Sequence, residues 1–149
     1  MACNPTICID FDGVIHSYTS GWKGVSAIPD PPVPGAIDAL LRYLDADFGV
    51  FIYSSRSKSL RGRWAMKRWL GKAIADHWVN GGESRFISFA ECECWGDAYS
   101  IVNCISWPWF KPAALITIDD RALTFNGDWS APEFQPDVIK GFRPWNSKK

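Results

Sequence analysis

Three short apolar runs in this chain each end in acidic or polar side chains, and this repetition constrains the fold more than any other feature. The runs are TICIDF at residues 6–11, GVFIY at 49–53 and AALITI at 113–118. Their β-branched residues and short length favour buried strands of a parallel sheet. Ligands of such sheets bind beyond the carboxyl ends of the strands, so the polar residues after each run mark the predicted site.

Helical patterns separate these runs. After Pro34-Gly35, apolar residues recur on one helical face up to about Asp47. A longer helical pattern runs from Ser57 to about His77. Alternating strands and helices predict an α/β fold, a three-layer Rossmann-like sandwich around a central, mostly parallel sheet. The length of 149 residues is that of one domain, which would span residues 1–149.

Four further segments carry weaker patterns. Residues 13–34 are rich in Gly and Pro, which predicts a loop or small hairpin able to cover the site as a flap. Residues 85–89 are a candidate strand, and about 90–110 is a Trp-rich segment in which we expect irregular structure. Residues 123–129, around Asn126-Gly127, predict a hairpin.

Composition excludes several classes of protein. Lys plus Arg and Asp plus Glu both total 16, so no net field would hold the chain on a long polyanion such as duplex DNA. No window approaches the ~20 apolar residues of a membrane-spanning helix and no secretory signal is visible, so we expect a cytoplasmic protein without a membrane partner. The five cysteines are expected to be reduced, with Cys92 and Cys94 as structural thiols rather than zinc ligands.

Asp10 and Asp12 stand two residues apart at the end of the first run. Side chains alternate across a strand, so both carboxylates can face one site. Carboxylates ~4 Å apart repel by about 4 kcal/mol at an effective dielectric constant of 20, and Asp119 and Asp120 after the third run would add to this repulsion. Magnesium suits such oxygen ligands and typically bridges carboxylates to a phosphate. We therefore expect a phosphoryl substrate, with a Ser hydroxyl and a Lys holding its other oxygens.

The same residues resemble a known family. Asp10-Phe11-Asp12-Gly13-Val14-Ile15 resembles the first motif of the haloacid dehalogenase-like (HAD) superfamily, an Asp-x-Asp-x-(Thr/Val) pattern after a hydrophobic strand. Ser54 resembles its second motif, Lys111 its third and Asp119-Asp120 its fourth, in the same order. The resemblance spans about residues 6–125, and the last part of it looks like the small stand-alone members found in bacteria and phages.

The resemblance implies a magnesium-dependent phosphatase. In it Asp10 attacks phosphorus and becomes an aspartyl phosphate, while Asp12 protonates the leaving oxygen and then activates water. The metal would be held by the Asp10 carboxylate, the backbone carbonyl of Asp12 and the carboxylate of Asp119, with Asp120 orienting a water of the metal. Ser54 and Lys111 would contact the phosphoryl group. No segment is long enough for a full cap domain, as in the capless members of the family.

Several of these residues also have a plainer interpretation. Ser54 can simply cap the following helix, and Ser55 can replace it as the phosphate ligand. Arg56 is a further candidate phosphate ligand. Lys111 can equally be a solvated surface residue, and His16 lies either over the site or in a structural role.

No acidic residue occurs between Phe48 and Ala75, while seven basic residues do. They are Arg56, Lys58, Arg61, Arg63, Lys67, Arg68 and Lys72. This basic run is either a solvated helix face or a positive patch that steers an anionic substrate.

The sequence thus favours a phosphomonoesterase that acts on a nucleotide or a nucleic-acid end, because aromatic residues near the motifs could stack on a base. Two alternatives stay open. One is a binding protein that keeps the fold and sequesters a phosphorylated ligand or partner without turnover. The other is a phosphotransferase that passes the phosphoryl group to an acceptor other than water.

Overall fold

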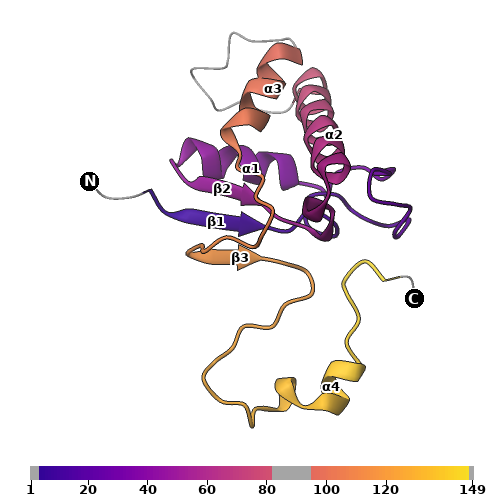
Figure 1. Cartoon of the computed structure of the whole chain (residues 1–149), viewed down its shortest axis with the longest axis vertical. Coiled ribbons are helices and arrows are strands. Elements are labelled where there is room, and N and C mark those ends of the chain that lie inside the picture. The colour runs from indigo at the N-terminus through magenta and orange to yellow at the C-terminus, as the bar shows by residue number, and fades with distance from the viewer. Residues whose placement is uncertain (1–3, 82–94, 148–149) are drawn as a thin grey trace.

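A three-stranded parallel sheet forms the framework of the computed structural model, which describes residues 4–81 and 95–147. The strand order is β2-β1-β3, with β1 (Thr6–Ile9) between β2 (Gly49–Ile52) and β3 (Ile116–Ile118). All three strands run in the same direction, so their carboxyl ends meet at one edge of the sheet (Figure 1). The prediction of an α/β chain with a parallel sheet is confirmed.

Two predicted helices pack on this sheet. α1 (Ala36–Asp45) begins after Gly35, whose φ of 81° is in the left-handed region that favours glycine. α2 (Leu60–Val79) begins after Ser59, whose side chain accepts a hydrogen bond from the backbone N–H of Gly62. Both helices bury one apolar face together with the strands. The core contains Ile7 and Ile9 of β1, Val50 and Ile52 of β2, Leu40 and Leu41 of α1, and Met66, Leu70 and Ile74 of α2.

The expectation of irregular structure at 90–110 is wrong for residues 95–104, which form α3 (Trp95–Cys104) and pack against α2. Buried residues of this segment recur every three or four positions, which is the spacing of one helical face. They are Ala98, Ile101, Val102 and Ile105. The candidate strand at 85–89 and Cys92 and Cys94 lie outside the described residues.

The hairpin expected at 123–129 is also wrong, because these residues form no strand. Asn126 accepts a hydrogen bond from the backbone N–H of Asp128 and makes a local turn instead. Phe125 and Trp129 pack on each other and on Phe134, with ring centroids 4.6 to 5.7 Å apart. The loop prediction for residues 13–34 is confirmed, since only isolated bridges at His16 interrupt it.

The C-terminal segment leaves the sheet after β3 and returns to the loop that follows β1 (Figure 1). It contains the short 3-10 helix η2 (Pro132–Phe134) and α4 (Pro136–Lys140). Trp145 Nε1 then donates a hydrogen bond to the carbonyl of Gly13 at 2.7 Å, and Asn146 Nδ2 donates to the carbonyl of Ser17 at 3.0 Å. These two bonds fasten the end of the chain beside the predicted site.

None of the helices in the described ranges is both long enough and apolar enough to cross a membrane. The cytoplasmic location stays a prediction.

Candidate functional site

An open cavity of about 330 Å³ lies where the three strands end. Six of the residues predicted from the sequence line it, namely Asp10, Asp12, Ser54, Ser55, Lys111 and Asp119. The rest of its wall is made by Cys8, Tyr18, Trp22, Tyr53, Thr117 and Arg121. The structure therefore brings motifs that are far apart in the sequence to one site.

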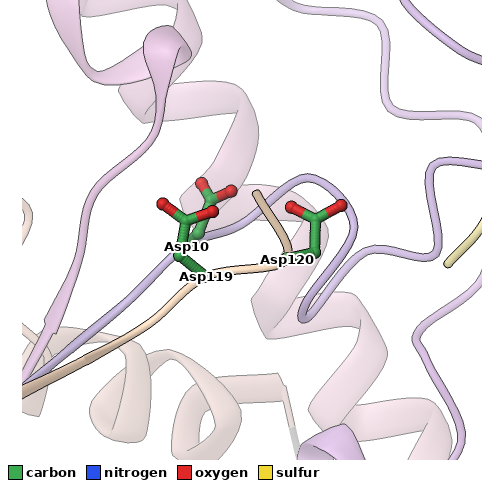
Figure 2. A group of neighbouring side chains, drawn as sticks. All are labelled: Asp10, Asp119 and Asp120. Carbon is green, nitrogen blue, oxygen red and sulfur yellow. The ribbon is translucent and has the colours of Figure 1, made fainter. Parts of the chain in front are cut away.

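Three carboxylates converge at this site, those of Asp10, Asp119 and Asp120 (Figure 2). We call them the acid cluster. One oxygen from each lies within 4.8 Å of the others. Asp10 follows β1 and the other two follow β3, and the backbone N–H of Asp10 donates to the carbonyl of Ile118 at 2.9 Å. The parallel register of these adjacent strands thus positions the acid cluster.

The carboxylate of Asp120 is almost inaccessible to solvent, with its side chain only 3% exposed. Neither of its carboxylate oxygens has a hydrogen-bond partner in the described part of the chain, and Arg121 Nε approaches Oδ2 only to 3.8 Å. Gly13, at a φ of 90°, packs so closely on this carboxylate that a Cβ there would clash with it. Burial raises the pKa of Asp120. A buried carboxylate without a partner is costly, and a bound cation would satisfy it.

Asp10 carries the largest change in acidity. Burial raises its pKa to about 7, and the negative charges of Asp119, Asp120 and Asp12 add to the increase. The backbone N–H of Phe11 acts in the opposite direction by donating a hydrogen bond to Asp10 Oδ1 at 2.7 Å. A carboxyl group perturbed in this way by burial and by like charges, in a cavity, is a candidate functional group.

Asp12 has the opposite environment, although it is only two residues away. Its Oδ1 is 2.9 Å from His16 Nδ1, and its Oδ2 accepts hydrogen bonds from Arg56 Nε at 2.8 Å and Ser54 Oγ at 3.4 Å. Burial alone would raise the pKa of Asp12, but the bonds from His16 and Arg56 outweigh it and lower the pKa. Its carboxylate stands apart from the acid cluster, so a metal contact would have to use the backbone carbonyl, which stays a prediction.

His16 is fully buried and does not line the cavity. Its Nε2 accepts a hydrogen bond from the backbone N–H of Asp30 at 3.2 Å. Because Nε2 is an acceptor, Nδ1 carries the proton and donates to Asp12. His16 is thus a positioning residue for Asp12.

Arg56 is also fully buried and is absent from the cavity wall. Besides its ion pair with Asp12, its Nη1 donates to the carbonyls of Gly24 at 2.7 Å and Val25 at 2.8 Å. Trp22 covers the guanidinium, with its ring centroid 4.6 Å from Arg56 Cζ. Arg56 therefore joins Asp12 to the loop at 13–34, and the geometry does not support the expected direct contact with phosphate.

The plainer interpretation of Ser54 as a helix cap is confirmed, and its contact with phosphate stays a prediction. Ser54 caps the 3-10 helix η1 (Ser55–Lys58), where its Oγ accepts a hydrogen bond from the backbone N–H of Arg56 at 3.3 Å. It also lines the cavity and contacts Asp12. Ser55 and Lys111 are exposed at the cavity wall, where both can meet a ligand.

Trp22 belongs to the loop that was expected to cover the site, whereas the other five wall residues were not predicted from the sequence. Cys8 and Thr117 each precede a predicted acid by two positions, so strand alternation could have placed them on the same side. Arg121 directly follows the acid pair, and its Cζ lies 5.9 Å from the ring centroid of Tyr18 across the rim. Tyr18 and Trp22 come from the loop at 13–34, and no periodic signal marks them.

Compared with known proteins, the chain matches no protein-family model, no curated protein and no solved structure. The class of the protein therefore has to be argued from the site itself.

Proposed function

We propose that this protein is a magnesium-dependent phosphomonoesterase that works through an aspartyl phosphate on Asp10. The observation that carries the proposal is the acid cluster, in which the oxygens of Asp120 have no hydrogen-bond partner among the described residues. Lys111 and Ser54 line the same cavity and supply the cation and hydroxyl that a phosphoryl group requires.

The donor set fits a hard divalent cation. Asp10, Asp119 and Asp120 offer only oxygen atoms, and their charges are not balanced by equal numbers of close cations in the described residues. These three residues would hold Mg²⁺, together with the backbone carbonyl of Asp12. When bound, the ion would neutralise the acid cluster and draw negative charge from the phosphoryl oxygens.

In the first step, a carboxylate oxygen of Asp10 attacks phosphorus and the bond from phosphorus to the leaving oxygen breaks. The leaving oxygen takes a proton from Asp12. Because His16 and Arg56 keep Asp12 ionised in the free protein, that proton has to arrive with the substrate. Phosphate monoesters have a second pKa of about 6, so a monoanionic substrate can supply it. Lys111 and Ser54 hold the non-bridging oxygens of the phosphoryl group as it is transferred.

In the second step, Asp12 removes a proton from water, whose oxygen attacks phosphorus. The bond between Asp10 and phosphorus breaks, which releases inorganic phosphate and restores the Asp10 carboxylate. The proton taken from water leaves with the products. His16 and Arg56 support this step, since they hold Asp12 in the ionised form that a base requires.

We further propose that the chain is a small capless member of the HAD superfamily with a three-layer, Rossmann-like sandwich. The order of Asp10-Asp12, Ser54, Lys111 and Asp119-Asp120 around one cavity supports this assignment. Tyr18 and Trp22 of the loop at 13–34 stand at the cavity wall where larger members would carry a cap. Such aromatic faces suit a nucleotide or a nucleic-acid end as substrate.

The test is phosphate release from p-nitrophenyl phosphate, with and without Mg²⁺. We expect turnover that EDTA abolishes and that Asp10→Asn reduces by several orders of magnitude, at about 1.4 kcal/mol of activation free energy for each. Asp45→Asn is the matched control, since Asp45 is exposed at the end of α1. Turnover by Asp10→Asn at the wild-type rate would exclude Asp10 as the nucleophile.

A further inference from the structure

We propose that an outward face of α2 binds single-stranded nucleic acid and leads its phosphorylated end into the cavity. The α2 face consists of Arg61, Arg63, Trp64, Lys67 and Arg68 of α2, together with Trp109 beside it. The reaction at the phosphate rests on the proposed function above, whereas binding by the α2 face is a property of its own.

The α2 face is positive, and no carboxylate in the described part of the chain forms an ion pair with its cations. Arg61 and Arg68 are exposed, and neither of them, nor Lys67, forms an ion pair with a carboxylate of the described residues. The chain has no acidic residue from Gly49 to Ile74, a stretch that contains every residue of the α2 face except Trp109. This local charge contrasts with the zero net charge of the chain, so attraction of a polyanion to this surface would be a local effect.

Exposed indole rings alternate with these cations. Trp64 is 61% exposed, and the Cζ of Arg68 lies 5.3 Å from its ring centroid. Trp109 is 41% exposed, and the Cζ of Arg63 lies 4.2 Å from its ring centroid. Both rings are therefore accessible to a ligand. Grooves for single-stranded nucleic acid combine such aromatic platforms for the bases with cations for the backbone.

The α2 face is continuous with the cavity. α2 starts at the edge of the sheet where β1 and β2 end and rises away from it (Figure 1). Trp109 is two residues from Lys111, which lines the cavity, and Trp22 at the cavity wall covers Arg56 in the same manner as the other two Arg–Trp pairs. From Leu60 to Arg68 the helix extends by about 12 Å. A strand with its end phosphate near Lys111 could therefore pass Trp109 and then Trp64.

Single strands fit these observations better than duplexes do. Bases have to be unstacked from their neighbours before they can stack on indole rings, and duplex ends offer few such bases. A duplex would contact the cations of the α2 face but would offer its indole rings few bases to stack on. An acidic protein partner would use the cations of the α2 face but not its indole rings.

The test measures binding of a fluorescent oligothymidylate with a 3′-phosphate by anisotropy, in EDTA so that no turnover occurs. We expect the double variant Arg61→Gln/Arg68→Gln to bind at least tenfold more weakly than the wild type. Its plot of log affinity against log salt concentration should be shallower by roughly 1.4, the value for two lost phosphate contacts on a single strand. The charge-matched control is Arg42→Gln/Lys140→Gln, which removes one cation each from α1 and α4. It should bind as the wild type does.

Trp64→Ala tests the aromatic part and should weaken binding roughly tenfold without changing the salt dependence. Cooperative urea unfolding establishes that each variant is folded. Any one of three results would overturn the inference. The wild type does not bind the oligonucleotide at low salt, the control variant loses as much affinity as Arg61→Gln/Arg68→Gln, or the wild type binds a duplex and poly-glutamate as tightly as it binds the single strand.

Release of p-nitrophenol from p-nitrophenyl phosphate reports the proposed function separately. Oligonucleotide binding without any such turnover would refute the phosphatase and leave the α2 face standing, and the reverse result would refute only the α2 face.

Discussion

Replacing Asp10 by Asn should stabilise the metal-free protein at alkaline pH, although it removes the proposed nucleophile. Asn has the same shape and keeps an oxygen that can accept the hydrogen bond from the backbone N–H of Phe11. It removes the negative charge that burial and the acid cluster make unfavourable. The variant therefore measures the free-energy cost of the negative charge at position 10 while it preserves the packing of the site.

The size of the effect follows from the pKa of Asp10, which rises from 3.8 to about 7 in the folded protein. Each pKa unit corresponds to 1.36 kcal/mol, so full ionisation costs the folded state roughly 4 kcal/mol, and partial exposure to solvent reduces this to about 2 to 4 kcal/mol. The repulsion between two charges at 4.8 Å is of similar size, about 3.5 kcal/mol at an effective dielectric constant of 20.

The direction of the pKa shift determines whether the stability of the protein rises or falls with pH. A raised carboxyl pKa leaves stability intact below the unfolded value near 4 and lowers it as the pH rises through the folded value of about 7. Asp120, whose pKa burial also raises, acts in the same direction. Asp12 has a lowered pKa, so its contribution is lost only below about pH 4 and leaves the interval from 5 to 8 unaffected.

The assay is urea unfolding in EDTA at pH 5 and pH 8, followed by Trp fluorescence. The stability of Asp10→Asn relative to the wild type should increase by roughly 2 kcal/mol between these pH values, while Asp45→Asn shows no such trend. Excess Mg²⁺ at pH 8 should stabilise the wild type and not Asp10→Asn. A relative stability that stays constant or falls with pH would refute the account of the acid cluster.

Three further predictions concern the same site. Gly13→Ala should lower Mg²⁺ affinity at least tenfold and destabilise the fold by about 1 to 3 kcal/mol, measured by calorimetry and urea unfolding, because the new Cβ clashes with Asp120 at a φ of 90°. Mg²⁺ binding near pH 7 should release protons, because Asp10 is partly protonated there. Calorimetry in buffers of different ionisation enthalpy measures the number of protons released, and a value of zero would contradict the raised pKa of Asp10. Arg56→Met should destabilise the protein by roughly 3 kcal/mol at pH 7, because it leaves the largely buried carboxylate of Asp12 without its permanently charged partner, and Asp12→Asn in the same chain should recover part of the loss in a double-mutant cycle.

Local sequence patterns were sufficient to predict the strands that precede the acidic residues of the site. The apolar runs ending at Asp10 and Asp119 and the one-sided pattern of α1 identify structures whose signals lie within a few residues of each other. α3 had such a signal in the spacing of Ala98, Ile101 and Val102, but the interleaved Trp residues concealed it. The hairpin prediction failed because Phe125 packs on Phe134, a contact that no local period encodes.

A local sequence pattern could not predict the ion pair of Asp12 either, because its partner is distant in the sequence. Its bond to Arg56 spans 44 positions, and the bond from Arg56 to Gly24 spans 32. The sequence named Asp12, Ser54 and Arg56 as site residues, yet only the tertiary structure shows that Arg56 holds Asp12 instead of lining the cavity. His16 likewise proves to be a buried partner of Asp12.

Chemical trapping tests the central claim, a phosphoryl group carried by Asp10, most directly. Borohydride reduces an acyl phosphate to an alcohol, so adding it during turnover of p-nitrophenyl phosphate with Mg²⁺ should convert Asp10 to homoserine, which peptide mass spectrometry detects. The label should be absent when EDTA replaces Mg²⁺ and absent in Asp10→Asn. Phosphate release by the wild type with no homoserine at position 10, or with the label on another carboxylate such as Asp119, would contradict the account.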